Sequence, residues 1–191
     1  DKAISMDPKN YDRLIEIYEA LADYGYREVG QEYLQNVLNT AKQLDAYDSG
    51  RIYYYLGDYQ KAYLALEEAK GKGGVDSYLY LGKAYAATGD YNYASSVYSN
   101  YLSKQGPDAE IYNQLGLCEL AKKDYQKALE AFQAGKQIEG NSLMQTLSFN
   151  EIVAYEYLQD YQKAAVLLNA YLQNYPDDQA AIREQQFLST R

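Results

Sequence analysis

The sequence predicts an all-α protein, a right-handed α–α superhelix of about five helix-turn-helix repeats that ends in a capping helix. Two observations predict this fold. A short motif returns four times along the 191 residues, and apolar side chains at helical spacing lie on both sides of each copy. The composition agrees with a folded chain, because 47% hydrophobic and 24% charged residues are typical of globular proteins.

The repeated motif contains an Asp-Tyr pair, and its clearest copy is Gly-Asp-Tyr-Gln-Lys-Ala at 57–62. The shared aspartate returns at intervals of 32, 34 and 36 residues, as Asp58, Asp90, Asp124 and Asp160. A period near 34 residues is typical of stacked helix pairs. The motif therefore sets the number of repeats and the place of the turn inside each one.

Each copy of the motif predicts how one helix ends and the next begins. Gly57 and Gly89 suit the left-handed residue that ends a helix, and the aspartate that follows suits the N-cap of the next helix. Lys123 and Gln159 replace this glycine in the later copies. Those two turns should be less favourable, because a side chain disfavours left-handed backbone.

The motif and its spacing resemble the tetratricopeptide repeat family. The best match is the repeat at 75–108, in which the family's characteristic places hold Leu81, Gly82, Tyr85, Gly89, Tyr91, Ala94 and Tyr98. The first repeat is degenerate, because Tyr18 and Gly30 break the pattern of large and small residues. Glu119 and Ile152 also depart from the family's pattern in the later repeats.

The resemblance implies a single array over residues 1–191, with repeats at 11–42, 43–74, 75–108, 109–144 and 145–178 and a capping helix at 179–189. Ala3 and Pro8 resemble the tail of a further repeat, so we expect the sequence to be a fragment of a longer protein.

The composition argues against most kinds of enzyme. The chain has no His, which excludes His-based acid–base and nucleophilic catalysis and His metal ligands. Phosphate-binding and calcium-binding loop motifs are missing. We therefore expect no enzyme, no cofactor and no metal site, and we expect the single cysteine, Cys118, to be a buried small residue.

Charge limits the class of partner. The chain holds 27 acidic and 18 basic residues, and its net charge of −9 argues against nucleic-acid binding. No apolar run approaches the roughly 18 residues that span a bilayer, so this segment should make no membrane contact. The oligomeric state stays open.

Tyrosine dominates the aromatic residues, with 25 Tyr against 3 Phe and no Trp. Twelve tyrosines occupy places that the repeat uses for packing, and we expect these to form the core: Tyr53, Tyr59, Tyr78, Tyr85, Tyr91, Tyr98, Tyr101, Tyr112, Tyr125, Tyr155, Tyr161 and Tyr171.

The resemblance also implies that the first helix of each repeat lines a concave groove. Its second, fifth, ninth, twelfth and thirteenth places point into that groove. Projected onto this sequence, with Tyr80 added at the edge of the groove, the candidate binding residues are Tyr47, Arg51, Tyr54, Tyr55, Tyr80, Lys83, Asn113, Leu117, Phe149, Val153 and Tyr157.

The predicted function is that of a non-catalytic scaffold whose groove binds a peptide or a segment of a partner protein. The alternative is a carbohydrate- or cell-wall-binding module of a bacterial surface lipoprotein that uses the groove tyrosines. Bacterial envelope lipoproteins are similar in composition, so an extracytoplasmic location, with an anchor upstream of residue 1, is favoured over the cytoplasm.

Two groove cations predict the charge of the partner. Arg51 and Lys83 share the ninth place of adjacent repeats, so we expect both to face the groove and to favour an anionic partner. Neutralisation by Glu19, Asp48 or Glu119 is the alternative. If both cations are exposed, replacing them with alanine should change stability by no more than about 0.5 kcal/mol.

Overall fold

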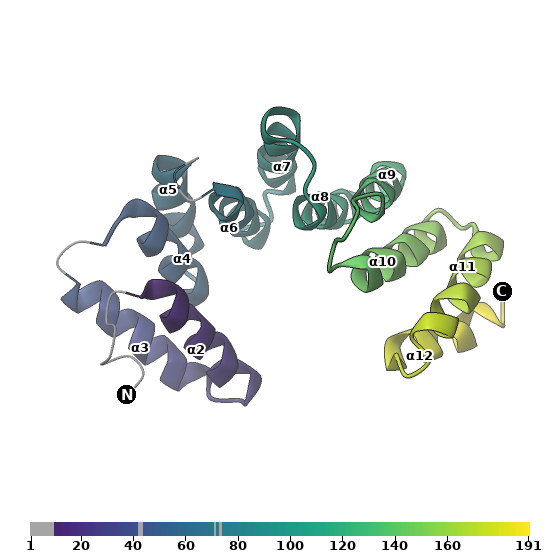
Figure 1. Cartoon of the computed structure of the whole chain (residues 1–191), viewed down its shortest axis with the longest axis horizontal. Helices are drawn as coiled ribbons and strands as arrows, with labels where there is room; N and C mark the ends of the chain where they lie inside the picture. Colours follow the sequence, from purple (N-terminus) through teal and green to yellow (C-terminus); the bar gives the residue numbers. More distant parts are fainter. Residues whose placement is uncertain (1–9, 42–43, 71, 73) are drawn as a thin grey trace. The chain divides into compact units, whose positions relative to one another are not determined.

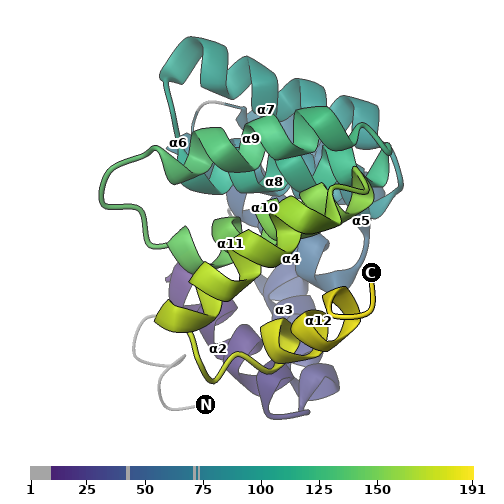
Figure 2. The same ribbon diagram turned by 90° about the vertical axis from the view of Figure 1, so that its right-hand side faces the viewer.

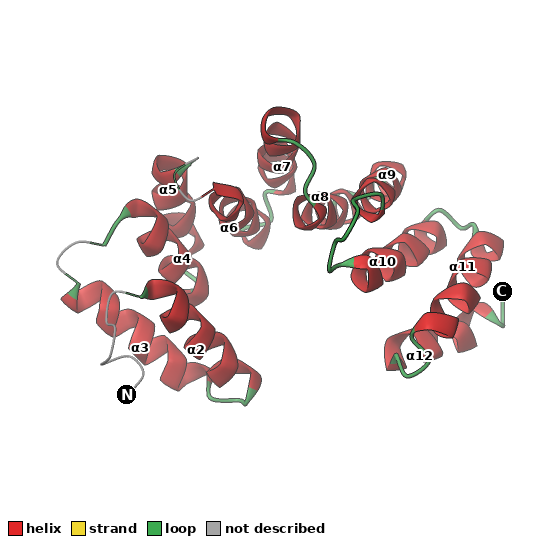
Figure 3. Cartoon of the chain, viewed as in Figure 1, coloured by secondary structure: helices red, strands yellow, loops and turns green. Residues whose placement is uncertain are grey.

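A computed structural model gives the fold, and it describes residues 10–41, 44–70, 72 and 74–191. Within these residues the chain forms eleven α-helices, α2 to α12, and no strand (Figures 1 and 3). The predicted all-α repeat fold is therefore confirmed. The chain divides into two compact units, Asp1–Thr88 and Gly89–Arg191, which we call unit 1 and unit 2.

Unit 1 is built from helices packed in sequence order: α2 (Tyr11–Asp23), α3 (Arg27–Thr40), α4 (Ala46–Leu56), α5 (Tyr59–Ala69) and α6 (Gly74–Ala87). Each helix contacts the next one along the chain, and α4 also contacts α6. Figure 1 shows the α2–α3 pair beside the α4–α5 pair. The first helices of neighbouring repeats therefore lie next to each other.

Unit 2 continues the same order with α7 (Tyr91–Gln105), α8 (Ala109–Ala121), α9 (Tyr125–Lys136), α10 (Met144–Tyr157), α11 (Tyr161–Asn174) and α12 (Gln179–Leu188). Successive helices again contact each other, as Figure 2 shows for α8, α9 and α10. The predicted repeats at 109–144 and 145–178 each hold one helix pair, and α12 lies in the range of the predicted capping helix. The single continuous array stays a prediction.

The turn inside each motif has the predicted geometry. Gly57 and Gly89 have φ angles of 81° and 84°, and Lys123 and Gln159 take the same left-handed conformation at 64° and 63°. The aspartate that follows caps the next helix, because its side chain accepts a hydrogen bond from the backbone N–H three residues on. The donors are Lys61 (3.3 Å), Tyr93 (3.2 Å), Lys127 (3.4 Å) and Lys163 (3.0 Å).

Small residues allow the helices of a pair to approach closely. The alanine of each motif copy is fully buried, at Ala62, Ala94, Ala128 and Ala164. On the facing helix, a Cβ added to Gly116 would come within 2.3 Å of Cε1 of Phe132. The ring of Phe132 therefore occupies the space that a side chain at Gly116 would need.

The degenerate first repeat packs by exchanging a large residue and a small one. Tyr18 is 5% exposed, and a Cβ added to Gly30 would come within 2.8 Å of its ring. The two departures from the family pattern therefore compensate for each other, which keeps the α2–α3 pair closely packed.

The twelve tyrosines of the predicted core are all at least half-buried. Tyr98 and Tyr171 are buried, at 0% and 4% exposure, and the other ten are half-buried. The phenol hydroxyl explains this, because it needs a polar partner that the apolar interior does not supply. The hydroxyl of Tyr85, for example, donates to Glu67 at 3.4 Å on the surface.

Candidate functional site

All of the predicted binding residues lie on the first helices of the repeats. In unit 1 these helices are α2, α4 and α6, and in unit 2 they are α8, α10 and α12. We call the two sets the first-helix surface of unit 1 and of unit 2. The α4–α6 contact joins neighbouring first helices in unit 1, and a hydrogen bond of 2.9 Å from Asn150 to Asn113 joins α10 to α8 in unit 2.

Arg51 of α4 is not an exposed groove cation. Its side chain is buried and forms ion pairs of 2.5 Å with Asp12 of α2 and with Asp48 one turn earlier. Burial disfavours the charge, but the hydrogen bonds that the guanidinium donates to both carboxylates outweigh it and raise the pKa of Arg51. The prediction of an open cation is therefore wrong. Asp48 neutralises Arg51, as the alternative held, together with Asp12.

The groove tyrosines of unit 1 bind one another. The rings of Tyr54, Tyr55 and Tyr80 lie within 5.9 Å of one another, centroid to centroid, at steep angles. The hydroxyls of Tyr55 and Tyr80 share a hydrogen bond of 2.9 Å, and Tyr55 also donates to Glu19. Burial is the main cause that raises the pKa of all three phenols.

The remaining candidates of unit 1 join this network at its edges. The guanidinium of Arg51 lies 4.3 Å from the ring centre of Tyr47, whose hydroxyl donates to Asp76 of α6 at 3.5 Å. The ammonium of Lys83 lies 5.9 Å from the ring centre of Tyr80. Together with the ion pair between Arg51 and Asp12, these contacts join α2, α4 and α6. The candidate residues of unit 1 therefore do form a cluster, but their side chains serve largely to join helices.

The first-helix surface of unit 2 is more open. Leu117 of α8 and Tyr157 of α10 are 40% and 54% exposed, Val153 is half-buried, and Phe187 of α12 is 39% exposed. Leu117, Val153 and Phe187 hold the ninth place of three successive first helices. Val153 and Phe187 line one hollow, and Leu117 holds the equivalent place of α8. We call these three residues the apolar strip.

Two candidates of unit 2 do not belong to this strip. Asn113 is buried and accepts the hydrogen bond from Asn150. Phe149 packs against the ring of Tyr171, 5.7 Å away, within the core of α10, α11 and α12. Both side chains are used in packing between helices.

A hollow of about 500 Å³ lies at the α12 end of the strip, lined by Val153, Glu156, Tyr157, Tyr161, Glu184 and Phe187. We call it the α10–α12 hollow. Val153 and Tyr157 were predicted as binding residues, whereas Glu156 and Glu184 were not. Glu156 occupies the twelfth place of its repeat, one of the places expected to face the groove, so the same rule could have identified it.

Glu156 contributes a partly enclosed carboxyl group to the hollow. Burial raises its pKa from 4.5 to about 7, with a further contribution from the negative charge of Glu184. Its Oε1 atom is enclosed and has no hydrogen-bond partner among the described residues. The hollow therefore combines aromatic walls with carboxylate oxygens.

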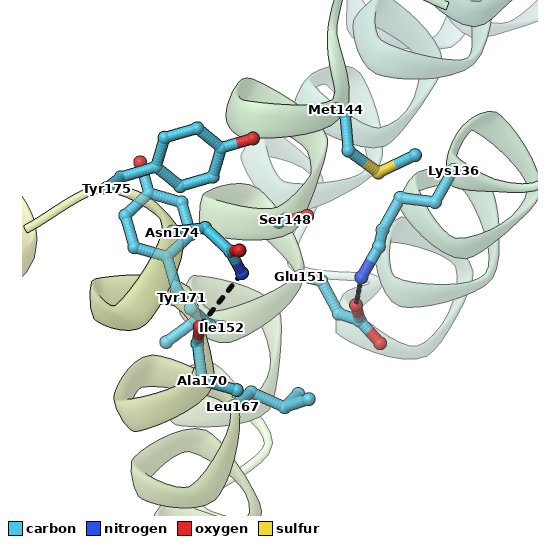
Figure 4. Close-up of a pocket in the computed structure, with 10 residues that line it drawn as sticks. All are labelled: Lys136, Met144, Ser148, Glu151, Ile152, Leu167, Ala170, Tyr171, Asn174 and Tyr175. Atoms are coloured by element: carbon cyan, nitrogen blue, oxygen red, sulfur yellow. Dashed lines mark hydrogen bonds and ion pairs between the residues drawn. The ribbon is translucent and has the colours of Figure 1, made fainter. Parts of the chain in front are cut away.

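A second hollow, of about 260 Å³, lies between α9, α10 and α11 (Figure 4). On one side Lys136 and Glu151 form an ion pair of 2.6 Å, and Tyr171 and Tyr175 lie on the other. Glu151 also accepts a hydrogen bond of 2.9 Å from Gln133. Because these neighbours already satisfy its charged groups, this hollow is a weaker candidate for a binding site.

Metal-binding and thiol chemistry find little support in the described residues. They hold no group of three or more Cys, Asp or Glu side chains placed to bind a metal ion. Cys118 is buried as predicted, and this burial raises the pKa of its thiol to about 12. None of the described helices combines the length and the apolar character that crossing a membrane requires.

Comparison with known families agrees with the repeat architecture. Two family profiles described as tetratricopeptide repeat match residues 79–142 and 149–178. The chain belongs to the tetratricopeptide repeat family. The matched residues thus include Leu117, Val153 and Tyr157. None of the curated protein sequences matches the chain.

Solved tetratricopeptide repeat proteins share the fold at low identity. TTC0263 of Thermus thermophilus is 15% identical with a TM-score of 0.71, over 95% of this chain and 100% of that one. YrrB, described as having an unusual peptide-binding site, is 20% identical with a TM-score of 0.63, over 97% and 96%. The second tetratricopeptide repeat domain of human RPAP3, solved with an HSP70 peptide, is 16% identical with a TM-score of 0.52, over 58% and 90%.

Proposed function

We propose that this protein is a non-catalytic interaction scaffold that binds a peptide or a segment of a partner protein. The binding surface is the first-helix surface of unit 2. The observation that carries the proposal is the apolar strip of Leu117, Val153 and Phe187, with Tyr157 beside it, on successive first helices. Exposed apolar and aromatic side chains of this kind are typical of protein-binding surfaces.

The family supports this proposal in general terms. Stacked helix pairs present extended surfaces without a closed pocket, and such surfaces suit a chain segment better than a small substrate. RPAP3 was solved with a bound peptide, and YrrB is described by its peptide-binding site. Carbohydrate binding through the tyrosines of unit 1 is less favoured, since Tyr54, Tyr55 and Tyr80 contact one another.

A phage-displayed library of random 12-residue peptides, panned against the whole chain, tests the proposal. Enriched peptides are labelled and their dissociation constants are measured by fluorescence anisotropy. Replacing Leu117 of the strip and the neighbouring Tyr157 together, as Leu117→Ser with Tyr157→Ser, should weaken binding at least tenfold. The matched control is Tyr93→Ser with Val166→Ser, because these residues are both 60% exposed but lie on the second helices α7 and α11.

The outcomes separate the two candidate functions. Circular dichroism first establishes that both double variants are folded. Equal loss of binding in the two double variants would overturn the choice of surface. If no peptide is enriched but a glycan array shows saturable binding, the carbohydrate alternative replaces the peptide proposal.

A further inference from the structure

The α10–α12 hollow brings three aromatic rings and two carboxylates to one place. Tyr157 comes from the end of α10, Tyr161 from the start of α11 and Phe187 from α12. Glu156 and Glu184 complete the lining from α10 and α12. Aromatic faces and carboxylates share one preference, because both attract a cation.

The rings already contact a guanidinium. The Cζ atom of Arg191 lies 4.6 Å from the ring centre of Phe187 and 5.9 Å from that of Tyr161. Both distances are in the range of cation–π attraction. Two of the three aromatic side chains of the hollow are therefore positioned to contact an arginine side chain.

The half-buried carboxylates of the hollow, Glu156 and Glu184, differ from the two buried carboxylates of unit 2. Glu119 forms an ion pair of 2.7 Å with Lys122, and Glu151 forms one of 2.6 Å with Lys136. Among the described residues, neither Glu156 nor Glu184 has such a partner. Among the described cations, Arg191 contacts two of the rings but forms no ion pair with either carboxylate. The two acidic groups therefore repel each other when both are charged, and a cation bound to both would remove that repulsion.

We propose that the α10–α12 hollow binds an arginine side chain of the partner segment. Guanidinium fits better than ammonium, because it is planar, stacks on aromatic rings and can donate to two carboxylates at once. This inference rests on the proposed function and specifies it further: the apolar strip binds the body of the segment, and the hollow selects an arginine at one end of it.

An NMR titration of the whole chain with small probes tests the inference. The probes are the Nα-acetyl amides of arginine, of lysine and of citrulline, a neutral analogue with nearly the shape of arginine. The arginine probe should shift the resonances of Tyr157 and Phe187, with a dissociation constant at least tenfold lower than those of the citrulline and lysine probes. Equal binding of citrulline would show stacking without charge recognition, and equal binding of lysine would show a general cation site. Either result overturns the inference.

Two matched variants test the carboxylates. Glu156→Gln with Glu184→Gln should weaken arginine binding at least tenfold. The control, Glu130→Gln with Glu139→Gln, changes the net charge equally at exposed positions of unit 2 and should leave binding within twofold. The first pair should fold normally, because it removes a repulsion, and a thermal melt checks this. Unchanged arginine binding by the folded Glu156 and Glu184 variant would overturn the inference.

The inference and the proposed function can fail separately. If library peptides bind in a manner that depends on Leu117 and Tyr157 while the arginine probe does not bind, the inference is wrong and the scaffold function stands. If no library peptide binds, the proposed function itself fails, whatever the arginine probe does.

Discussion

Arg51 illustrates how one side chain changes its role when its neighbours are known. It is 5% exposed and pairs with Asp12 and Asp48, so it joins α2 to α4. Removing one partner of a buried ion pair leaves the other without compensation, which is strongly destabilising. Because Asp12 is largely exposed and can regain water, the loss should be smaller than for a fully buried pair.

We therefore predict that Arg51→Ala lowers the free energy of unfolding by about 2–3 kcal/mol. Arg13→Ala, at an exposed position of α2, should change it by less than about 0.5 kcal/mol. Urea unfolding followed by circular dichroism measures both values. Equal stabilities of the two variants would contradict the role assigned to the buried ion pair.

Glu156 gives a prediction for the dependence of stability on pH. Its pKa is about 7 in the folded protein and 4.5 for the free side chain, so the folded state binds the proton more tightly. This contribution to stability is full below about pH 4.5 and is lost as the pH rises through 7. The groups that face Glu156 are Glu184, Tyr157 and Tyr161, and Arg191 lies beside the last of these.

The parent should therefore be more stable at pH 5 than at pH 8 through this group, and Glu156→Gln should remove that difference. Solvent screens the half-exposed side chain, so the change should be about 1 kcal/mol. Urea unfolding at both pH values measures it, with Glu139→Gln as the control. The carboxyls of Asp58 and Asp178 have lowered pKa values and titrate below this window. A pH difference that persists in Glu156→Gln would refute the assignment.

At the scale of single elements, the turns between paired helices have one backbone conformation and two kinds of sequence. Lys123 and Gln159 hold the left-handed conformation that Gly57 and Gly89 hold elsewhere. For a residue with a side chain this conformation costs about 1–2 kcal/mol. Replacement by glycine removes this cost, but the greater freedom of glycine in the unfolded chain cancels part of the gain in stability.

Lys123→Gly and Gln159→Gly should each raise the free energy of unfolding by about 0.5–1 kcal/mol. Gly57→Ala and Gly89→Ala should each lower it by about 1 kcal/mol. A Cβ added to either glycine has no atom within 4 Å, so this loss reports backbone conformation and not a clash. Thermal and urea unfolding of the four variants measure the effects, and destabilisation by Lys123→Gly would contradict the explanation.

At the scale of the whole molecule, the net charge of −9 governs long-range encounters. Arg51 is paired with two aspartates, so its charge is not available to a partner. One of the two cations that suggested an anionic partner is therefore neutralised. We predict no saturable binding of a 30-base-pair DNA or of single-stranded RNA in gel-shift assays at 50 mM salt. A salt-dependent shift at micromolar protein would contradict this.

The sequence alone determined the repeat and its turns. Asp58 and its three counterparts recur at nearly constant spacing, and a left-handed residue followed by an N-cap is a local arrangement that depends only on neighbouring residues. For that reason the helix pairs, the caps and the two less favourable turns were all predictable. The burial of Cys118 was predictable too, because it holds a place that other repeats fill with small or aliphatic residues.

Only the tertiary structure decided how the side chains of the first helices are used. Whether Arg51 faces solvent or a carboxylate depends on Asp12, which is 39 residues away in sequence. Likewise, Glu156 and Glu184 form one hollow with Phe187 because α10, α11 and α12 fold together, and periodicity gives no distance between them. Helix positions follow from local spacing, whereas pairing, burial and charge compensation depend on which helices become neighbours.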